Sequence, residues 1–451
     1  MKNLVIIGGS DAGISAALRA REIDPRVQPV MIVADAFPNF SICGLPYFIG
    51  GDVTDWRTLA HRTAGEIEAA GIRLLTEHTA RSIDTGSRRV TVDAPGGKKI
   101  SLDYDALVIA TGAVSVRPPL PGLDSPGVFF LRWMRDSFAI NDYIRDARPT
   151  AAVIIGAGYI GMEMSESLAR RGMKVTIVEA APSVMPSMEP ALGAKIADAL
   201  ASNGISVHTG TGVESITRDG GGLVVHGTAG FRAAAGLVLV SVGGAPNTEL
   251  GRSIGMETGV RGALRVTRKM ESGIPGVYAA GDCVETRHRM LRDPFYLPLG
   301  TVAHKQGRVA GENAAGGDAE FAGSLGTQSV KIFDTVAART GLNEREARGA
   351  GLDPVSADFE GWDHKAYYPG AKKIFIRVTA DTLSGKILGA QMLGAYGTEV
   401  SKRIDIFAAA LYHEMTVREF SNYDLSYTPP LSSPWDPVQT AVQHLERTMK
   451  K

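Results

Sequence analysis

The chain has 451 residues, of which 44% are hydrophobic and 21% charged, and its 48 basic and 48 acidic side chains cancel to a formal net charge of zero. Without an excess of positive charge, the chain has no electrostatic reason to bind nucleic acid or an anionic membrane. A chain of this length should divide into about three domains, and its two cysteines are too few for a disulfide framework.

The first predicted element is a buried strand at Leu4 to Ile7, an apolar stretch far too short for a signal sequence or a membrane span. We therefore expect a cytoplasmic protein. A tight glycine-rich turn leads to a helix at Ile14 to Ile23, and a second strand follows at Val30 to Val33. This order is that of a nucleotide-binding βαβ unit, in which a pyrophosphate lies at the N-terminus of the helix.

The turn of this first unit, Gly8 to Gly13, is irregular, because Ser10 stands where the G-x-G-x-x-G motif has its second glycine. The acidic residue that should follow the second strand is also displaced. Asp35 is the only nearby carboxylate, and we predict that it binds a ribose. The alternative is that Asp35 is a solvated loop acid.

A cysteine follows a short distance after this turn, in the segment Ser41 to Tyr47 with the sequence Ser-Ile-Cys-Gly-Leu-Pro-Tyr. A thiol at this place can meet the edge of a flavin, so Cys43 indicates redox chemistry through one sulfur. A buried structural cysteine is the alternative.

A second βαβ unit spans Ala152 to Glu179 and contains a regular G-x-G-x-x-G turn, Gly156-Ala157-Gly158-Tyr159-Ile160-Gly161. Glu179 ends the strand that follows, where a carboxylate binds ribose hydroxyls. Because Glu179 would repel a 2′-phosphate, and two alanines follow it, we favour NADH over NADPH.

Two buried strands that end in small residues, Ala106 to Gly112 and Val238 to Gly244, each follow one βαβ unit. This pattern indicates that a whole domain is repeated. A third strand-like segment precedes Gly281-Asp282, and we expect this pair to begin a helix that faces a ribityl chain and phosphate. We interpret Cys283 as a small buried hydrophobic residue. Beyond Gly323 the pattern has no nucleotide signature, which indicates a separate interface domain.

Together these motifs resemble the flavin-dependent pyridine nucleotide-disulfide oxidoreductases. The resemblance is to their single-cysteine branch, which holds coenzyme A-disulfide reductases, NADH oxidases and peroxidases, and persulfide reductases. It covers essentially the whole chain and is carried by Cys43 to Tyr47, Ala110 to Gly112, Gly156 to Gly161, Glu163, Ala280 to Asp282, Gly307 to Asn313, Tyr367 to Ala371 and Asp424 to Pro430.

The resemblance implies an α/β fold with two Rossmann-like domains and a C-terminal α+β domain. The FAD-binding domain would span residues 1–113 and 248–322, the NAD(P)-binding domain 114–247, and the dimerisation domain 323–451. The protein would be a homodimer whose active site is shared across the interface, with a small thiol, disulfide or persulfide as its substrate.

The resemblance also implies roles for particular residues. Cys43 would cycle beside the flavin, while Tyr159 would cover the flavin face until nicotinamide enters. Tyr427 and one of Tyr367 or Tyr368, of which we favour Tyr367, would reach the partner subunit's active site, where a phenol can protonate a leaving thiolate. Core or interface aromatic residues are the alternative. The residues expected at FAD are Gly8, Ser10, Gly13, Asp35, Thr111, Gly112, Gly281, Asp282 and Thr301; those expected at the nicotinamide nucleotide are Gly156, Gly158, Tyr159, Ile160, Gly161, Glu163 and Glu179. We expect no metal ligands.

Four positions depart from the pattern of the coenzyme A-disulfide reductases. At one of them, Ala245 stands in place of the usual Arg of the second strand-end motif. Ile42 stands where they usually carry Asn, and Glu22 stands where they carry the second Arg of a pair. Both changes weaken an assignment of coenzyme A as ligand. His304 occupies a position often held by Asn, and we interpret it as a surface histidine of a helix, although it could tune the cysteine or the flavin.

We therefore predict a flavoenzyme that takes hydride from NADH into FAD and passes electrons through Cys43, as a thiolate of lowered pKa, to a low-molecular-weight disulfide, persulfide or polysulfide. One alternative is an NADH oxidase or peroxidase that works through a cysteine sulfenate. A second alternative is a reductase of a small electron-transfer protein, with Cys43 incidental. A third is a flavin-bearing sensor protein with negligible turnover.

Overall fold

The computed structural model describes residues 2–450. Its first parallel sheet combines strands from the N-terminal part of the chain with one strand that follows much later in the sequence. The strand order is β18-β7-β1-β2-β3, and every neighbouring pair is parallel. The outer strand β18 joins strands that precede it by more than 160 residues, so the second βαβ unit is inserted within the first. The strands are β1 (Lys2–Ile7), β2 (Val27–Ile32), β3 (Arg73–Leu75), β7 (Ala106–Ile109) and β18 (Val277–Ala279).

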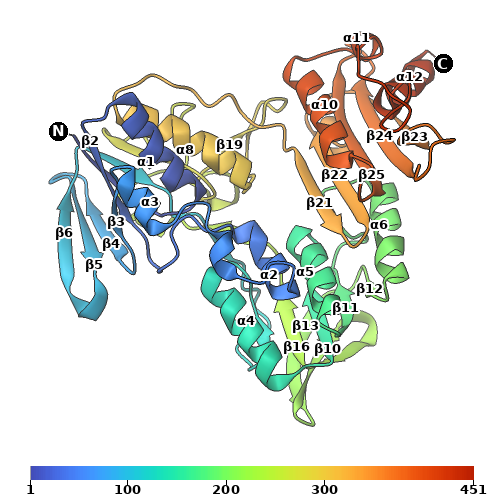
Figure 1. Ribbon diagram of the computed structural model, residues 1–451. Coiled ribbons are helices and arrows are strands. Elements are labelled where there is room, and N and C mark those ends of the chain that lie inside the picture. The colour runs from blue at the N-terminus through green and yellow to red at the C-terminus, as the bar shows by residue number, and fades with distance from the viewer. Residues whose placement is uncertain (1, 451) are drawn as a thin grey trace.

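Helices α1 (Asp11–Ile23) and α8 (Gly300–Ala314) lie side by side against this sheet (Figure 1). Their backbones touch because α8 presents glycines at the contact. A Cβ atom on Gly307 would lie 2.2 Å from the carbonyl oxygen of Ala12, and one on Gly311 would lie 2.1 Å from that of Ala16. The two glycines therefore set the distance between the helices.

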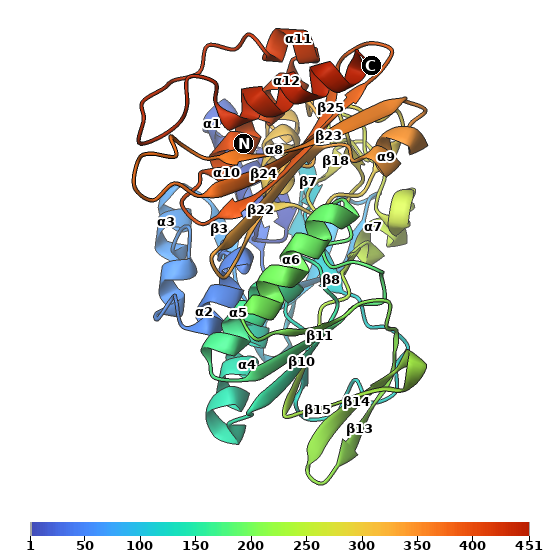
Figure 2. The same cartoon turned by 90° about the vertical axis from the view of Figure 1, so that its right-hand side faces the viewer.

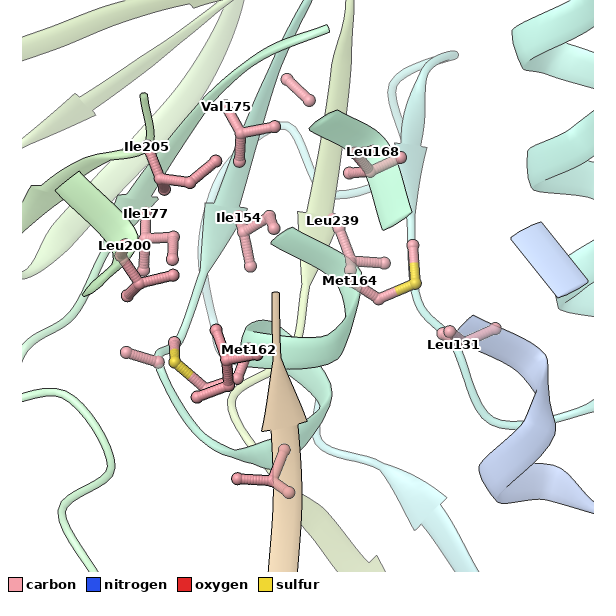
Figure 3. Packing of buried hydrophobic residues seen from close by; sticks show 14 of the residues in the cluster. Leu131, Ile154, Met162, Met164, Leu168, Val175, Ile177, Leu200, Ile205 and Leu239 are labelled. Atoms are coloured by element: carbon pink, nitrogen blue, oxygen red, sulfur yellow. The ribbon is translucent and has the colours of Figure 1, made fainter. Parts of the chain in front are cut away.

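The second parallel sheet has the order β12-β11-β10-β16-β9 and repeats the plan of the first. Side chains from its strands and from α5 form a buried core, in which Ile154, Met164 and Leu239 lie close together (Figure 3). The predicted repeat of a whole domain is thus confirmed. The elements are β9 (Val128–Phe129), β10 (Ala151–Ile155), β11 (Lys174–Val178), β12 (Ser206–His208), β16 (Leu237–Val240), α4 (Met134–Ala147), α5 (Tyr159–Arg170) and α6 (Pro190–Ser202).

Small antiparallel sheets accompany each parallel sheet. The turn between β13 and β14 falls at residues 219–222. The short pair β8 and β17 forms where the chain passes between the two units. The elements are β4 (Thr79–Asp84), β5 (Arg89–Asp93), β6 (Lys99–Asp103), β8 (Ala113–Ser115), β13 (Val213–Asp219), β14 (Gly222–Gly227), β15 (Phe231–Ala235), β17 (Gly244–Pro246), α3 (Ala64–Ala69) and α7 (Glu249–Ser253).

The expected helix at Gly281-Asp282 is wrong. The chain there forms a loop with two short strands, β19 (Thr286–Arg287) and β20 (Pro294–Phe295), and the next helix, α8, begins only at Gly300. Asp282 therefore lies at a strand end and in a loop, with no helix behind it.

The C-terminal part is an antiparallel sheet of order β21-β22-β25-β24-β23, against which α10 and α12 pack (Figure 2). The buried Glu166 of α5 joins it to the second parallel sheet, since its carboxylate accepts hydrogen bonds from Lys331 Nζ and Phe333 N, each at 2.7 Å. The elements are β21 (Gln328–Ile332), β22 (Thr335–Gly341), β23 (Pro354–Trp362), β24 (Lys373–Asp381), β25 (Ile387–Ala395), α9 (Glu344–Gly349), α10 (Val400–Tyr412), α11 (Val417–Phe420) and α12 (Pro437–Met449).

Across residues 2–450, no helix is long and apolar enough to cross a membrane. Within the same residues, no group of three or more His, Cys, Asp and Glu side chains is placed to hold a metal ion. The domain boundaries given above remain a prediction.

Candidate active site

Cys43 lies in a short 3-10 helix (Ile42–Gly44) that continues directly into α2 (Leu45–Gly50). Its side chain is exposed, whereas Leu45 and Ile49, on the helix that follows, are fully buried. Because these buried residues anchor the segment, the thiol is held at a fixed place and is open to a small molecule. The alternative of a buried structural cysteine is therefore wrong for Cys43.

The protein by itself does not lower the pKa of the Cys43 thiol. The largest effect is desolvation by the surrounding protein, which raises that pKa. The negative charges of Glu163, Asp11 and Asp282 raise it further, while the positive charge of Arg132 lowers it. We expected the lowered pKa to come from a flavin beside the sulfur, aided by a helix N-terminus. The charged side chains that act on the thiol are mostly acidic, so together they do not lower its pKa.

Glu163 faces the cysteine segment from α5, and Tyr47 Oη donates a hydrogen bond of 3.3 Å to its Oε1 atom. Burial raises the pKa of Glu163 to about 7, so this carboxyl can hold or release a proton at neutral pH. Burial also raises the pKa of Tyr159, at the start of α5, to about 12, which keeps its phenol neutral.

Helix α5 also holds the backbone of α2. Ser167 Oγ donates to the carbonyl oxygen of Pro46 at 2.7 Å, and Arg171 Nη1 donates to that of Ile49 at 2.8 Å. An ion pair of 2.8 Å between Arg170, at the end of α5, and Asp52, just after α2, also joins the two segments. The helix that carries Tyr159 and Glu163 therefore fixes the segment that carries Cys43.

The regular glycine turn between β10 and α5 leaves space for a ligand. Gly156 has φ +104°, and a Cβ atom on Gly161 would lie 2.2 Å from the carbonyl oxygen of Gly156, so packing requires both glycines. In front of Gly158, by contrast, no protein atom lies within 4 Å of the Cβ position. An open face at the second glycine fits the approach of a pyrophosphate. Ile160, two residues on, is also exposed.

Glu179 reaches back to this turn from the end of β11. Its Oε2 atom accepts a hydrogen bond from Ala157 N and its Oε1 atom one from Ala181 N, both at 2.7 Å. The backbone thus orients the carboxylate beside the glycine turn, where a ribose-binding acid has to lie. Its contact with a ribose stays a prediction.

The first turn is tightly packed at two of its three predicted positions. A Cβ atom on Gly8 would lie 2.1 Å from the carbonyl oxygen of Ala110, and one on Gly13 would lie 1.9 Å from the carbonyl oxygen of Gly8. Ser10 is the N-cap of α1, and its side chain makes no capping hydrogen bond. Asp35 accepts a hydrogen bond from Phe37 N at 2.9 Å, and burial raises its pKa. Asp35 is therefore held by the loop, whether or not it binds a ribose.

The structure brings one arginine to this site that the sequence did not single out. Arg132 Nη2 forms an ion pair with Asp282 Oδ2 at 2.7 Å and lies 4.0 Å from the Cβ position of Gly112. Its Nε atom is buried without a hydrogen-bond partner among the described residues. A buried donor left unpaired beside a glycine turn fits a phosphate oxygen, so these residues are suited to hold FAD. Arg132 lies just before α4 in no recognisable motif, and no sequence signal marks it.

Thr111 and Gly112 lie where the chain passes between the two units. Thr111 Oγ1 donates to the carbonyl oxygen of Asn247 at 2.6 Å, and Asn247 N donates to that of Gly112 at 2.9 Å. Cys283 is fully buried, and its sulfur lies 3.5 Å from the carbonyl oxygen of Ile109. Its interpretation as a buried residue is confirmed.

Three further polar residues gather where α1 meets the start of α8. Ser15 Oγ lies 2.7 Å from His304 Nδ1, and His304 Nε2 lies 3.4 Å from Asp11 Oδ1. His304 therefore has partners, and with 45% of its side chain exposed it lies at the surface of α8, as predicted. Thr301, in the first turn of α8, is exposed.

Tyr367 and Tyr427 lie in two neighbouring loops of the C-terminal part. Lys365 N donates to the carbonyl oxygen of Pro429 at 3.3 Å, which joins the loops. The buried Arg403 of α10 also donates to the carbonyl oxygens of Asp363 and Leu431. Tyr367 is 73% exposed and Tyr427 44% exposed. Both phenols are thus available to another molecule.

Two family models match the chain. Residues 2–307 match the model described as pyridine nucleotide-disulphide oxidoreductase, and residues 327–437 match the dimerisation domain of the same group. An NAD(P)H sulfur oxidoreductase (CoA-dependent) of Pyrococcus furiosus is 33% identical, and the alignment covers 97% of both chains. An NADH oxidase of Methanocaldococcus jannaschii is 32% identical over 97% of both chains. The solved structure of an NAD-dependent persulfide reductase from A. fulgidus is 35% identical with a TM-score of 0.95, covering 99% of this chain and 83% of that one.

Proposed function

The chain belongs to the pyridine nucleotide-disulphide oxidoreductase family, which uses FAD and NAD(P)H, and on that premise we propose that it reduces a low-molecular-weight disulfide, persulfide or polysulfide with electrons from NADH. The observation that carries the proposal is the exposure of Cys43 beside Glu163 and Tyr47, while Cys283 is fully buried. Only one sulfur is then available for exchange with a substrate, which excludes an internal disulfide in the resting enzyme.

When bound, FAD accepts hydride from nicotinamide and makes an electron pair available to sulfur. The chain's own residues bind and orient the two nucleotides. The turns at Gly8 to Gly13 and Gly156 to Gly161 would receive the pyrophosphates, and the unpaired Arg132 Nε would supply a donor near the first of them. Glu179 would bind the ribose of NADH and repel the 2′-phosphate of NADPH.

Cys43 would attack the sulfur substrate and carry it as a mixed disulfide or persulfide. Glu163 and Tyr47 would lie at the nicotinamide, where a carboxyl with a pKa of about 7 can hold a proton. We further propose a homodimer in which Tyr367 and Tyr427 reach the partner subunit's active site and donate hydrogen bonds to a leaving thiolate. A reducing cytoplasm would keep Cys43 available between turnovers.

The substrate class is drawn from the chemistry of a single thiol and from the names of the relatives. The relative from Pyrococcus furiosus is named CoA-dependent, whereas this chain has Ile42 and Glu22 at two departures from the coenzyme A pattern. In addition, Glu22 is paired with Arg19, which leaves less free positive charge on α1 for a phosphate. We therefore propose a small persulfide or disulfide substrate without committing the chain to coenzyme A.

The test is an anaerobic titration of the FAD-loaded protein with NADH, followed by the flavin spectrum, in parallel with Cys43→Ser. We expect the wild type to take up one more two-electron equivalent than the variant and to release a small thiol that mass spectrometry identifies. An extra equivalent without a released thiol would point to a sulfenate and hence to an oxidase or peroxidase. Identical titrations of both proteins would remove Cys43 from the reaction and favour a reductase of an electron-transfer protein.

A further inference from the structure

One face of the C-terminal sheet carries a row of polar side chains. Arg339 of β22, Gln391 of β25 and Arg377 of β24 are paired directly across neighbouring strands, so their side chains share one face. Arg339 is 6% exposed and Gln391 is 4% exposed. The opposite face of the sheet is apolar and packs against α10 and α12. The buried polar groups of the row therefore need partners, and these come from the unit built on the second parallel sheet.

The partner is the segment Met185 to Glu189, which leads from β11 into α6. Arg339 Nη1 donates a hydrogen bond to the carbonyl oxygen of Ser187. Two residues on, Glu189 N donates to Gln391 Oε1 at 2.8 Å. Helix α6 itself lies against β22 and β25 (Figure 2). The C-terminal sheet thus holds the backbone of this segment at two positions.

Arg339 is fixed in turn by residues of the C-terminal part. Its Nη2 atom donates to Glu346 Oε2 at 2.6 Å and to the carbonyl oxygen of Gly341 at 2.9 Å. The ion pair compensates for the burial of the guanidinium charge. Because the guanidinium is planar, these contacts of Nη2 also fix the direction of Nη1, which reaches Ser187.

The other end of the segment contacts the regular glycine turn. Met185 N donates to the carbonyl oxygen of Ala157 at 2.9 Å. Met188 N donates to the carbonyl oxygen of Met185 at 2.8 Å, so Ser187 and Met185 belong to one tight turn. Met185 is buried and has φ +48°, a conformation that residues with side chains rarely adopt, so its surroundings must enforce it.

The hydrogen bond from Met185 acts on the nucleotide site through one peptide group. The carbonyl of Ala157 and the N–H of Gly158 belong to the same planar group, so fixing the first also fixes the direction of the second. Gly158 is the N-cap of α5, and the N-terminus of a helix is where a pyrophosphate binds. Glu179 holds the other side of Ala157 by accepting a hydrogen bond from its N–H.

We propose that Arg339 is a positioning residue for the nicotinamide nucleotide: through the segment Met185 to Glu189, it sets the orientation of the Ala157–Gly158 peptide group that receives the pyrophosphate of NADH. The inference rests on the proposed function and adds a residue of the C-terminal part to the nucleotide site. Every link from Arg339 to the glycine turn is a hydrogen bond or a shared peptide group. The affinity for NADH then depends on Arg339, whereas hydride transfer from bound NADH does not.

The experiment uses the FAD-loaded protein with Arg339→Met and Arg339→Lys, and with Asp381→Ala as the matched control. Asp381 is also 6% exposed, and its carboxylate accepts hydrogen bonds from Asp353 and Ser384 at the turn between β24 and β25. Anaerobic rapid mixing with NADH gives the Kd for NADH and the limiting rate of flavin reduction. Hydrogen–deuterium exchange without nucleotide follows residues 156–161 and 183–189, and FAD content and Tm are measured for each protein.

For Arg339→Met we expect the Kd for NADH to rise about tenfold, a typical size for coupling through residues that do not touch the ligand. The limiting rate of flavin reduction should stay the same, and exchange should become faster in both followed stretches. Arg339→Lys keeps the charge beside Glu346 and should recover part of the affinity. Asp381→Ala should lower the Tm but leave the Kd and the exchange of both stretches unchanged.

An unchanged Kd in Arg339→Met would overturn the inference, and so would an equal rise in Asp381→Ala, which would indicate a general loss of stability. Should Arg339→Met fail to bind FAD, Gln391→Met decides, because it removes only the acceptor of Glu189 N. An unchanged Kd and unchanged exchange in that variant would overturn the inference. Disulfide reduction that survives Cys43→Ser would instead overturn the proposed function and leave the comparison of Kd values standing.

Discussion

Tyr47 and Glu163 belong to segments 116 residues apart, yet the phenol Oη donates to the carboxylate Oε1 across 3.3 Å. Tyr47 ends the segment that carries Cys43, and Glu163 lies on α5, the helix that follows the regular glycine turn. The hydrogen bond therefore joins the proposed sulfur chemistry to the proposed nicotinamide site. A change in the protonation of Glu163 should therefore affect both the cysteine segment and the proposed nicotinamide site.

The raised pKa of Glu163 predicts how stability depends on pH. Between its ordinary pKa of 4.5 and its folded value of about 7, the folded protein keeps a proton that the unfolded chain has lost. The contribution of Glu163 to the stability of the folded protein is thus fully present below pH 4.5 and is lost as the pH rises to about 7. Relative to Glu163→Gln, the free energy of unfolding of the wild type should fall by at most about 3 kcal/mol over this pH range. The fall should be smaller because the Glu163 side chain is partly exposed. Urea unfolding at four pH values measures the difference, and parallel curves for the two proteins would contradict it.

Arg132 should govern the affinity for FAD. Replacement by Met removes the unpaired Nε donor and the partner of Asp282, and leaves that carboxylate facing the cofactor. We expect the Kd for FAD to rise between about tenfold and a hundredfold, as for loss of one or two charged hydrogen bonds. The recovery of FAD fluorescence on release gives the Kd. Arg135→Met, at an exposed position of α4, is the control, and an equal loss in both variants would argue against a specific contact.

Glu179 should decide between the two nicotinamide nucleotides. Its carboxylate accepts two backbone hydrogen bonds, and Gln can keep only one of them as an acceptor. For Glu179→Gln we expect the KM for NADH to rise about tenfold while the KM for NADPH changes less, since repulsion of the 2′-phosphate is removed. Steady-state kinetics with both nucleotides test this. If the ratio of the two KM values stays the same, Glu179 does not contact the ribose.

Gly307 should be intolerant of any side chain. A Cβ atom there would lie 2.2 Å from the Ala12 carbonyl oxygen, so Gly307→Ala must separate α8 from α1 and disturb the turn that precedes α1. We expect a loss of about 2 kcal/mol or more, as for overpacking in a core, together with weaker FAD binding. Thermal unfolding measures it. Gly65→Ala in α3 is the control, because no atom lies within 4 Å of its Cβ position, and this variant should be neutral or slightly more stable.

Much of the fold followed from local pattern. Short apolar runs, glycine turns and helices with small residues predicted both nucleotide-binding units, and the structure confirms the strands and helices around them. The failure at Asp282 has a physical reason. A strand followed by Gly-Asp has the same local pattern whether a helix or a loop comes next, and here two short strands intervene before Gly300.

The sequence by itself determined the parts whose signal lies within a few residues: the position of Cys43, the two glycine turns and the repeat of a whole domain. Only the tertiary structure paired Arg132 with Asp282, 150 residues away, and Ser15 with His304, 289 residues away. These long-range contacts depend on the order of the strands and on the distance between α1 and α8, and neither produces a periodic pattern in the sequence. Burial and neighbouring charge then set the pKa values of Asp11, Cys43 and Glu163, so the acid-base character of the site is a property of the folded protein alone.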